Sequence, residues 1–130
     1  MISTFVHGIL DYLWCILLIA APWLFGYNRV GIDTYVADSI AAIVFTYSLF
    51  TKYELSFSKN ISTRTHLLFD LISGILLATS PWLFGFANQV YLPHLLFGIF
   101  AVVVSLLTKR RSKIELAEIK TKKETGYVAG

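Results

Sequence analysis

The chain has 130 residues, of which 56% are hydrophobic and 15% are charged, and its formal net charge is +3. A soluble domain usually carries about 25% charged residues, so the composition argues against a soluble globular protein, and the length fits a single domain. The charges are also unevenly placed: residues 71–108 contain no Asp, Glu, Lys or Arg, and residues 2–28 contain only Asp11. Apolar stretches of this kind match bilayer-spanning helices of roughly 20 residues.

The first two predicted elements are membrane-spanning helices over residues 3–25 and 33–52. No Lys or Arg precedes the first apolar run and no small-residue cleavage site follows it, so we expect a retained helix rather than a signal peptide. The second helix carries Asp33 and Asp38 near its start, and its boundaries are the least clearly marked.

Two further spans are predicted over residues 63–86 and 91–108, and a basic tail over residues 109–130 follows them. Gly74 and Ala78 form a small-x-x-x-small step in the third span. Such a step favours close helix approach in lipid, where apolar surface alone drives little association. The sequence therefore predicts an all-α, membrane-spanning four-helix bundle.

The distribution of Lys and Arg predicts the orientation of this bundle. Arg29 follows the first span, whereas ten of the eleven basic residues fall on the opposite side. These ten are Lys52, Lys59, Arg64, Lys109, Arg110, Arg111, Lys113, Lys120, Lys122 and Lys123. Cytoplasmic loops carry the excess of Lys and Arg, so we expect a multi-pass protein of the cell (inner) membrane with both termini cytoplasmic. The cluster Lys109–Lys113 is expected to lie at anionic lipid headgroups, and no nucleic-acid partner is expected.

The sequence contains an internal repeat with an offset of 59 residues. Residues 2–26 and 61–85 are identical at 13 of 25 positions. The identical positions, numbered in the first copy, are Ile2, Ser3, Thr4, His7, Asp11, Ile16, Leu17, Leu18, Pro22, Trp23, Leu24, Phe25 and Gly26. Each copy begins a helical hairpin, repeat one over about residues 1–58 and repeat two over about residues 59–108. Two spans return the chain to its starting side, so the sequence predicts two parallel-oriented hairpins related by a pseudo-two-fold axis along the membrane normal.

Both copies end in Pro-Trp-Leu-Phe-Gly, and this motif carries a family resemblance. The stretches Ala21-Pro22-Trp23 and Ser80-Pro81-Trp82, each followed by Leu-Phe-Gly and preceded by His-x-x-x-Asp, resemble the SPW repeat family of small prokaryotic integral membrane proteins. The resemblance covers about residues 1–108. It implies a four-span repeat protein, and it implies no established activity.

The repeated motif has a structural interpretation that we favour over a ligand pocket at the paired helix ends. Its residues are Pro22, Trp23, Leu24, Phe25 and Gly26 in the first copy and Pro81, Trp82, Leu83, Phe84 and Gly85 in the second. Proline removes one helical hydrogen bond, tryptophan is stabilised at the headgroup level, and glycine suits the left-handed position after a helix end. In the second copy, we expect the Ser80 hydroxyl to help satisfy the carbonyl that Pro81 leaves without its partner, whereas Ala21 in the first copy has no such group.

The candidate polar site consists of His7, Asp11, His66 and Asp70. Each His–Asp pair has i, i+4 spacing and shares one helix face, and we expect the two aspartates to face each other's helices near the pseudo-two-fold axis. Intramembrane carboxylates usually face the bundle interior and often mark function. The favoured interpretation is interhelical hydrogen bonding that fixes the register. A proton or ion path, a metal site and a bis-histidine haem are progressively less favoured alternatives. His94 and Asp38 are minor candidates for a shared outer site.

No catalytic signature or phosphate-binding loop occurs in the sequence. We therefore expect a non-enzymatic membrane protein with a structural or interaction role, without a cofactor or metal. The alternative is a small proton or ion channel or carrier that uses the His–Asp pairs. Association with further copies of the chain would suit either hypothesis.

Overall fold

The computed structural model describes residues 2–27, 31–51, 61–111 and 113–126. Within these residues it contains five helices and no β-strand, so the predicted all-α class is confirmed. The helices are α1 (Thr4–Phe25), α2 (Ile32–Leu49), α3 (Thr63–Leu83), α4 (Leu92–Leu107) and α5 (Lys113–Glu124). The first four match the predicted spans, with ends that differ by at most three residues. Three basic residues used to predict the orientation, Arg29, Lys52 and Lys59, lie outside the described residues.

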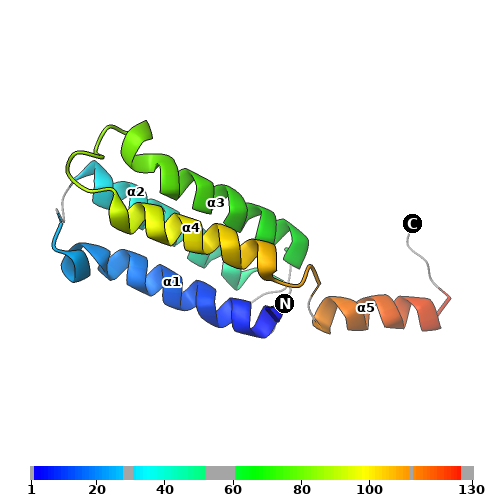
Figure 1. Ribbon diagram of the computed structural model, residues 1–130. Coiled ribbons are helices and arrows are strands. Elements are labelled where there is room, and N and C mark those ends of the chain that lie inside the picture. Colours follow the sequence, from blue (N-terminus) through cyan, green and yellow to red (C-terminus); the bar gives the residue numbers. More distant parts are fainter. Residues whose placement is uncertain (1, 28–30, 52–60, 112, 127–130) are drawn as a thin grey trace.

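Helices α1 to α4 form a bundle in which α1 and α3 lie diagonally opposite each other. Each of these two helices packs against both α2 and α4, and the closest packing is between α3 and α4. Figure 1 shows α1 and α3 running in the same direction, with α2 and α4 running back. The apolar core lies between the helices and includes Trp14, Leu18 and Leu77.

The close packing of α3 on α4 depends on Gly74, Ala78 and Gly98. A Cβ atom added to Gly98 would lie 2.5 Å from both the backbone nitrogen of Ala78 and the carbonyl oxygen of Gly74. The step at Gly74 and Ala78 predicted from the sequence therefore lies at a close helix contact. Its partner on α4, Gly98, was not identified from the sequence.

The two copies of the repeat begin and end their first helices in similar ways. Ser3 and Ser62 cap α1 and α3, because their side chains accept hydrogen bonds from the backbone N–H groups of Val6 and Thr65. Gly26 and Gly85 both have left-handed φ values, 70° and 75°, after the helix ends. These caps set where each helix enters and leaves the bundle.

The repeated motif ends each helix with a buried proline and an exposed tryptophan. Pro22 and Pro81 are buried, whereas Trp23 and Trp82 are 62% and 57% exposed. The Ser80 hydroxyl donates a 2.7 Å hydrogen bond to the carbonyl oxygen of Leu77, the group that loses its amide donor to Pro81. The local role predicted for Ser80 is therefore present in the second copy.

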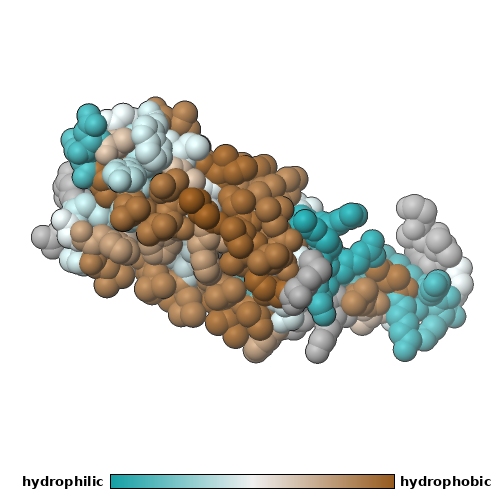
Figure 2. Space-filling view, in the orientation of Figure 1, coloured by the Kyte–Doolittle hydropathy of each residue, from teal (hydrophilic) through white to brown (hydrophobic). Residues whose placement is uncertain are grey.

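Apolar side chains cover the outside of the bundle. Figure 2 shows a hydrophobic surface along the bundle and hydrophilic side chains on α5. Helices α1 and α3 are long and apolar enough to cross a bilayer, and α4 is a shorter apolar helix. A soluble monomer rarely exposes so large a continuous apolar surface, so the surface indicates a membrane protein.

Candidate functional site

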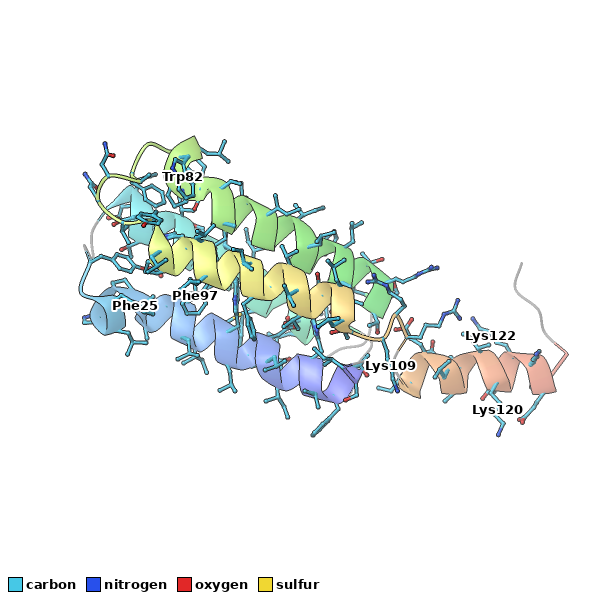
Figure 3. The ribbon with its side chains drawn as sticks, viewed as in Figure 1. Phe25, Trp82, Phe97, Lys109, Lys120 and Lys122 are labelled. Atoms are coloured by element: carbon cyan, nitrogen blue, oxygen red, sulfur yellow. The ribbon has the colours of Figure 1, made fainter. Side chains whose placement is uncertain are left out.

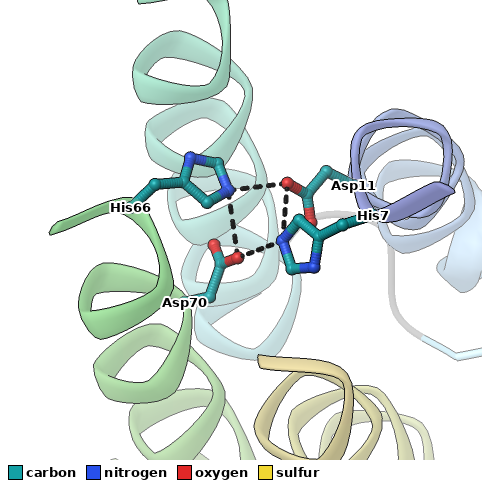
Figure 4. A group of neighbouring side chains, drawn as sticks. All are labelled: His7, Asp11, His66 and Asp70. Atoms are coloured by element: carbon teal, nitrogen blue, oxygen red, sulfur yellow. Dashed lines mark hydrogen bonds and ion pairs between the residues drawn. The ribbon is translucent and has the colours of Figure 1, made fainter. Parts of the chain in front are cut away.

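The structure brings together all four residues of the predicted polar site. His7 and Asp11 lie one turn apart on α1, and His66 and Asp70 occupy the equivalent positions on α3. Their exposed fractions are 3%, 8%, 1% and 4%, in that order. Figure 4 shows the two pairs pointing toward each other across the bundle. We call these four residues the His–Asp quartet.

The quartet is a closed ring of alternating nitrogen and oxygen atoms. The contacts between helices are the shorter ones: His7 Nε2 lies 2.8 Å from Asp70 Oδ2, and His66 Nε2 lies 2.7 Å from Asp11 Oδ2. Within each helix the corresponding distances are 3.1 Å for His7–Asp11 and 3.0 Å for His66–Asp70. Pairing therefore extends across the two repeats and is not confined to the i, i+4 neighbours.

Two threonines that sequence reasoning missed hold the outer nitrogen atoms of the imidazole rings. His7 Nδ1 lies 2.8 Å from Thr108 Oγ1, and His66 Nδ1 lies 2.7 Å from Thr51 Oγ1. Each threonine comes just after the second helix of a hairpin, and each is followed by Lys in the sequence. The repeated Thr-Lys pair was the signal that could have revealed them.

The threonine hydroxyls determine which imidazole nitrogen carries a proton. Thr108 Oγ1 donates to the carbonyl oxygen of Val104 at 2.6 Å, and Thr51 Oγ1 donates to that of Tyr47 at 2.8 Å. A hydroxyl has one proton, so a threonine that donates to its backbone carbonyl accepts from its histidine. Both Nδ1 atoms are therefore N–H donors, and both Nε2 atoms face the carboxylates.

Tyr47 on α2 completes the surroundings of the quartet. Its hydroxyl donates a hydrogen bond to Asp70 Oδ1, so the two oxygens of this carboxylate have different partners. The Tyr47 ring also lies edge-on to the His66 ring, with centroids 4.9 Å apart. Thr51 and Thr108 are 57 residues apart, and the same offset aligns Tyr47 with Val104. Because valine has no hydroxyl, this contact has no counterpart in the second hairpin.

A small cavity lies beside the quartet. Its volume is about 20 Å³, and its walls include His7, Asp11 and Asp70 together with mainly apolar side chains such as Trp14 and Phe100. This volume accommodates about one water molecule. The quartet is thus enclosed by protein and adjoins little space for a mobile solute.

The two minor candidates, His94 and Asp38, do not pair with each other. His94 is fully buried, and its Nε2 donates a 2.9 Å hydrogen bond to the backbone carbonyl of Asp33. The rings of Tyr27 and Phe86 pack against it, with centroids 5.7 and 5.0 Å away. His94 therefore belongs to the packing between the first turns of α2 and α4, and no hydrogen bond joins it to Asp38 among the described residues.

Comparison with known proteins identifies a family. The family model described as the SPW repeat domain matches residues 5–108. No curated protein and no solved structure matches the chain. The matched region includes all of the four bundle helices except the first residue of α1, and it includes the whole quartet.

Proposed function

We propose that this chain, which belongs to the SPW repeat family, is a four-span protein of the bacterial inner membrane with a scaffold or interaction role. The apolar exterior of the bundle and the length of α1 and α3 support a membrane location. On this proposal, α2 and α4 also cross the bilayer because they return the chain beside α1 and α3.

The described basic residues support an orientation with both termini in the cytoplasm. Arg64 lies in the first turn of α3, and Lys109, Arg110 and Arg111 follow α4, all at the end of the bundle where α1 starts. Figure 3 shows Lys109 at this end, while Phe25 and Trp82 lie at the other. Lys and Arg are enriched on the cytoplasmic side, and Trp is enriched at the membrane–water interface.

The basic end also offers a groove suited to an anionic lipid headgroup. Arg64 and Arg110 line a groove of about 350 Å³ between α3 and α4, together with Leu68, Leu71 and Leu106. Cationic side chains beside an apolar wall match a phosphate group with an acyl chain below it. We therefore extend the expected lipid contact from Lys109–Lys113 to Arg64.

The observation that carries the structural role is the closed contact ring of the His–Asp quartet. Each carboxylate touches a histidine of the other hairpin, so the four side chains connect the two repeats inside the bundle. An isolated Asp in the middle of a bilayer costs about 2.5–3.5 kcal/mol on insertion scales. The ring offsets this cost, and it requires α1 and α3 to keep one register.

The small enclosed cavity supports a structural role over the alternative of a channel or carrier. A transport path for protons or ions needs a connected series of polar groups or waters, and the space beside the quartet accommodates about one water. The two functions still lead to different predictions. A channel or carrier would need the aspartates for ion flux but not for folding, whereas a structural role needs them for folding.

Substitution of the two aspartates separates these functions. We expect Asp11→Asn and Asp70→Asn to lower the thermal unfolding midpoint of the detergent-purified protein, because each variant removes one of the two carboxylates that the buried histidines share. Proteoliposomes containing the wild type should show no proton flux in a pH-sensitive dye assay. Asp38→Asn, outside the quartet, is the control. Proton flux that disappears in stably folded aspartate variants would support the channel or carrier instead.

A further inference from the structure

We propose that the His–Asp quartet binds one divalent transition-metal ion, such as Zn²⁺, between α1 and α3. This inference rests on the proposed structural role, because the ion would join the same two helices. It departs from the expectation of no metal that the sequence alone supported. The new information is the convergence of the four side chains and the threonine contacts behind them.

The donor set and its spacing suit such an ion. Two imidazole nitrogens and two carboxylate oxygens alternate around a ring with sides of 2.8, 3.0, 2.7 and 3.1 Å. The four atoms lie within 4.8 Å of one another, close enough for Zn–N and Zn–O bonds of about 2.0–2.2 Å once the side chains adjust to the tetrahedral arrangement that zinc prefers. Nitrogen and oxygen donors of these types bind first-row divalent metals.

The threonine contacts leave the inner nitrogen atoms available to an ion at the centre. Both Nδ1 atoms donate to threonines, so each Nε2 atom faces the two carboxylate oxygens and is a metal ligand in the neutral form of the ring. The two carboxylates need positive charge beside them. Two imidazolium protons would supply it through hydrogen bonds, and one dication would supply it while bonding to all four atoms.

The groups behind the ligands have the arrangement that metal sites use. A metal-bound histidine almost always donates its other ring N–H to a polar group that fixes the ring. Thr51 and Thr108 supply this acceptor for His66 and His7. Tyr47 binds Asp70 Oδ1 and leaves Oδ2 to face both histidines.

The direct test is the metal content of the full-length protein, purified in detergent without chelator. Elemental analysis should find one divalent metal ion per chain in the wild type, and the double variant His7→Ala/His66→Ala should lose it. His94→Ala is the matched control: His94 is the third and last histidine of the chain and lies at the opposite end of the bundle. Loss of metal from His94→Ala but not from the double variant would overturn the proposal.

A second measurement on the wild type alone avoids reliance on a variant that fails to fold. After chelation, addition of Zn²⁺ should raise the unfolding midpoint in a saturable manner, because a ligand that binds only the folded state stabilises it. Addition of Co²⁺ should give a visible absorption band. Thr51→Val/Thr108→Val should weaken the metal affinity by about 10- to 100-fold, as loss of such supporting groups does.

These results distinguish the metal proposal from the structural role beneath it. A wild-type protein without metal, with no saturable response to Zn²⁺ or Co²⁺, would overturn metal binding. If Asp11→Asn still lowers the unfolding midpoint of that protein, the structural role stands without the ion. If the wild type binds metal but the aspartate variants unfold like the wild type, the metal site stands and the structural role fails.

Discussion

At the scale of single residues, Ser80 and Ala21 form a natural comparison. They occupy the same position before the proline of each motif, but only Ser80 can donate to the carbonyl that the proline leaves without an amide partner. The equivalent carbonyl in the first copy belongs to Leu18. In lipid, a backbone carbonyl without a donor is unfavourable, so the two helix ends should differ in stability.

We expect Ser80→Ala to lower the free energy of unfolding by about 0.6 kcal/mol, and at most by roughly 1.7 kcal/mol, the range of hydrogen bonds measured inside membrane proteins. Ala21→Ser should raise it by a similar amount by giving Leu18 the missing donor. Unfolding in detergent, followed by tryptophan fluorescence, would measure both changes. A neutral Ser80→Ala together with a destabilising Ala21→Ser would show that the hydroxyl has no such role.

The residues of the quartet could be predicted from sequence, but their partners could not. The repeated His-x-x-x-Asp spacing places each pair on one helix face, and the 59-residue offset indicates that the pairs are equivalent. The sequence did not show that the shorter contacts run between the helices, since this depends on how α1 and α3 are rotated in the bundle. Thr51 and Thr108 were missed because they follow the helices at a different offset, 57 residues.

At the scale of helices, the existence of the four bundle helices could be predicted, and their ends were predicted less accurately. The third span was expected to reach residue 86, but α3 ends at Leu83. The carbonyl oxygen of Pro81 accepts hydrogen bonds from the N–H groups of Phe86 and Ala87, so the chain turns before the apolar sequence ends. The residues of this turn are still mainly apolar, so the hydropathy pattern cannot show where the helix ends.

The contact between α3 and α4 leads to a prediction about Gly98. We expect Gly98→Ala to lower the free energy of unfolding by about 1–3 kcal/mol, the usual cost of overpacking. The added Cβ would lie 2.5 Å from backbone atoms of α3, which cannot rotate away as a side chain can. Equilibrium unfolding in detergent would measure the loss.

Ile99→Ala is the matched control for this helix, because Ile99 is 47% exposed on the outside of α4. It should leave the α3–α4 contact intact and change stability less than Gly98→Ala does. Gly74→Leu should resemble Gly98→Ala, while Leu76→Phe on the exposed side of α3 should resemble the control. Equal effects at Gly98 and Ile99 would mean that the helices separate easily at this contact.

At the scale of the whole molecule, each hairpin begins against the end of the other. The backbone of Ile2 exchanges hydrogen bonds with Leu107 and Lys109, and the N–H of Ile61 donates to the carbonyl oxygen of Phe50. The two histidines show the same reciprocal pattern, because His7 and His66 each form a hydrogen bond with a threonine of the other hairpin. Each hairpin therefore supplies backbone and threonine partners for the start of the other hairpin's first helix.

The tail is attached to this arrangement at the basic end of the bundle. Glu115 on α5 accepts a 2.9 Å hydrogen bond from the backbone N–H of Thr63, the first residue of α3. A carboxylate is favourable at a helix N-terminus because the macrodipole is positive there. The link holds the start of α5 at the end of the bundle where α3 begins, so the side on which the tail lies reports the orientation of the entire bundle.

Labelling of single cysteines tests this orientation. Cys15 is buried, and the variant Cys15→Ser would provide a background without cysteine. In this background, Asn88→Cys would report on the turn between α3 and α4, and Lys120→Cys would report on the exposed face of α5. A maleimide that cannot cross membranes should label intact cells at residue 88 and not at residue 120, because the described basic residues gather at the end that carries α5. Both positions should react after permeabilisation, which controls for accessibility. The reverse pattern would place both termini outside and remove the basis for the lipid headgroup contact at Arg64 and Arg110, while the contacts of the quartet would remain as they are.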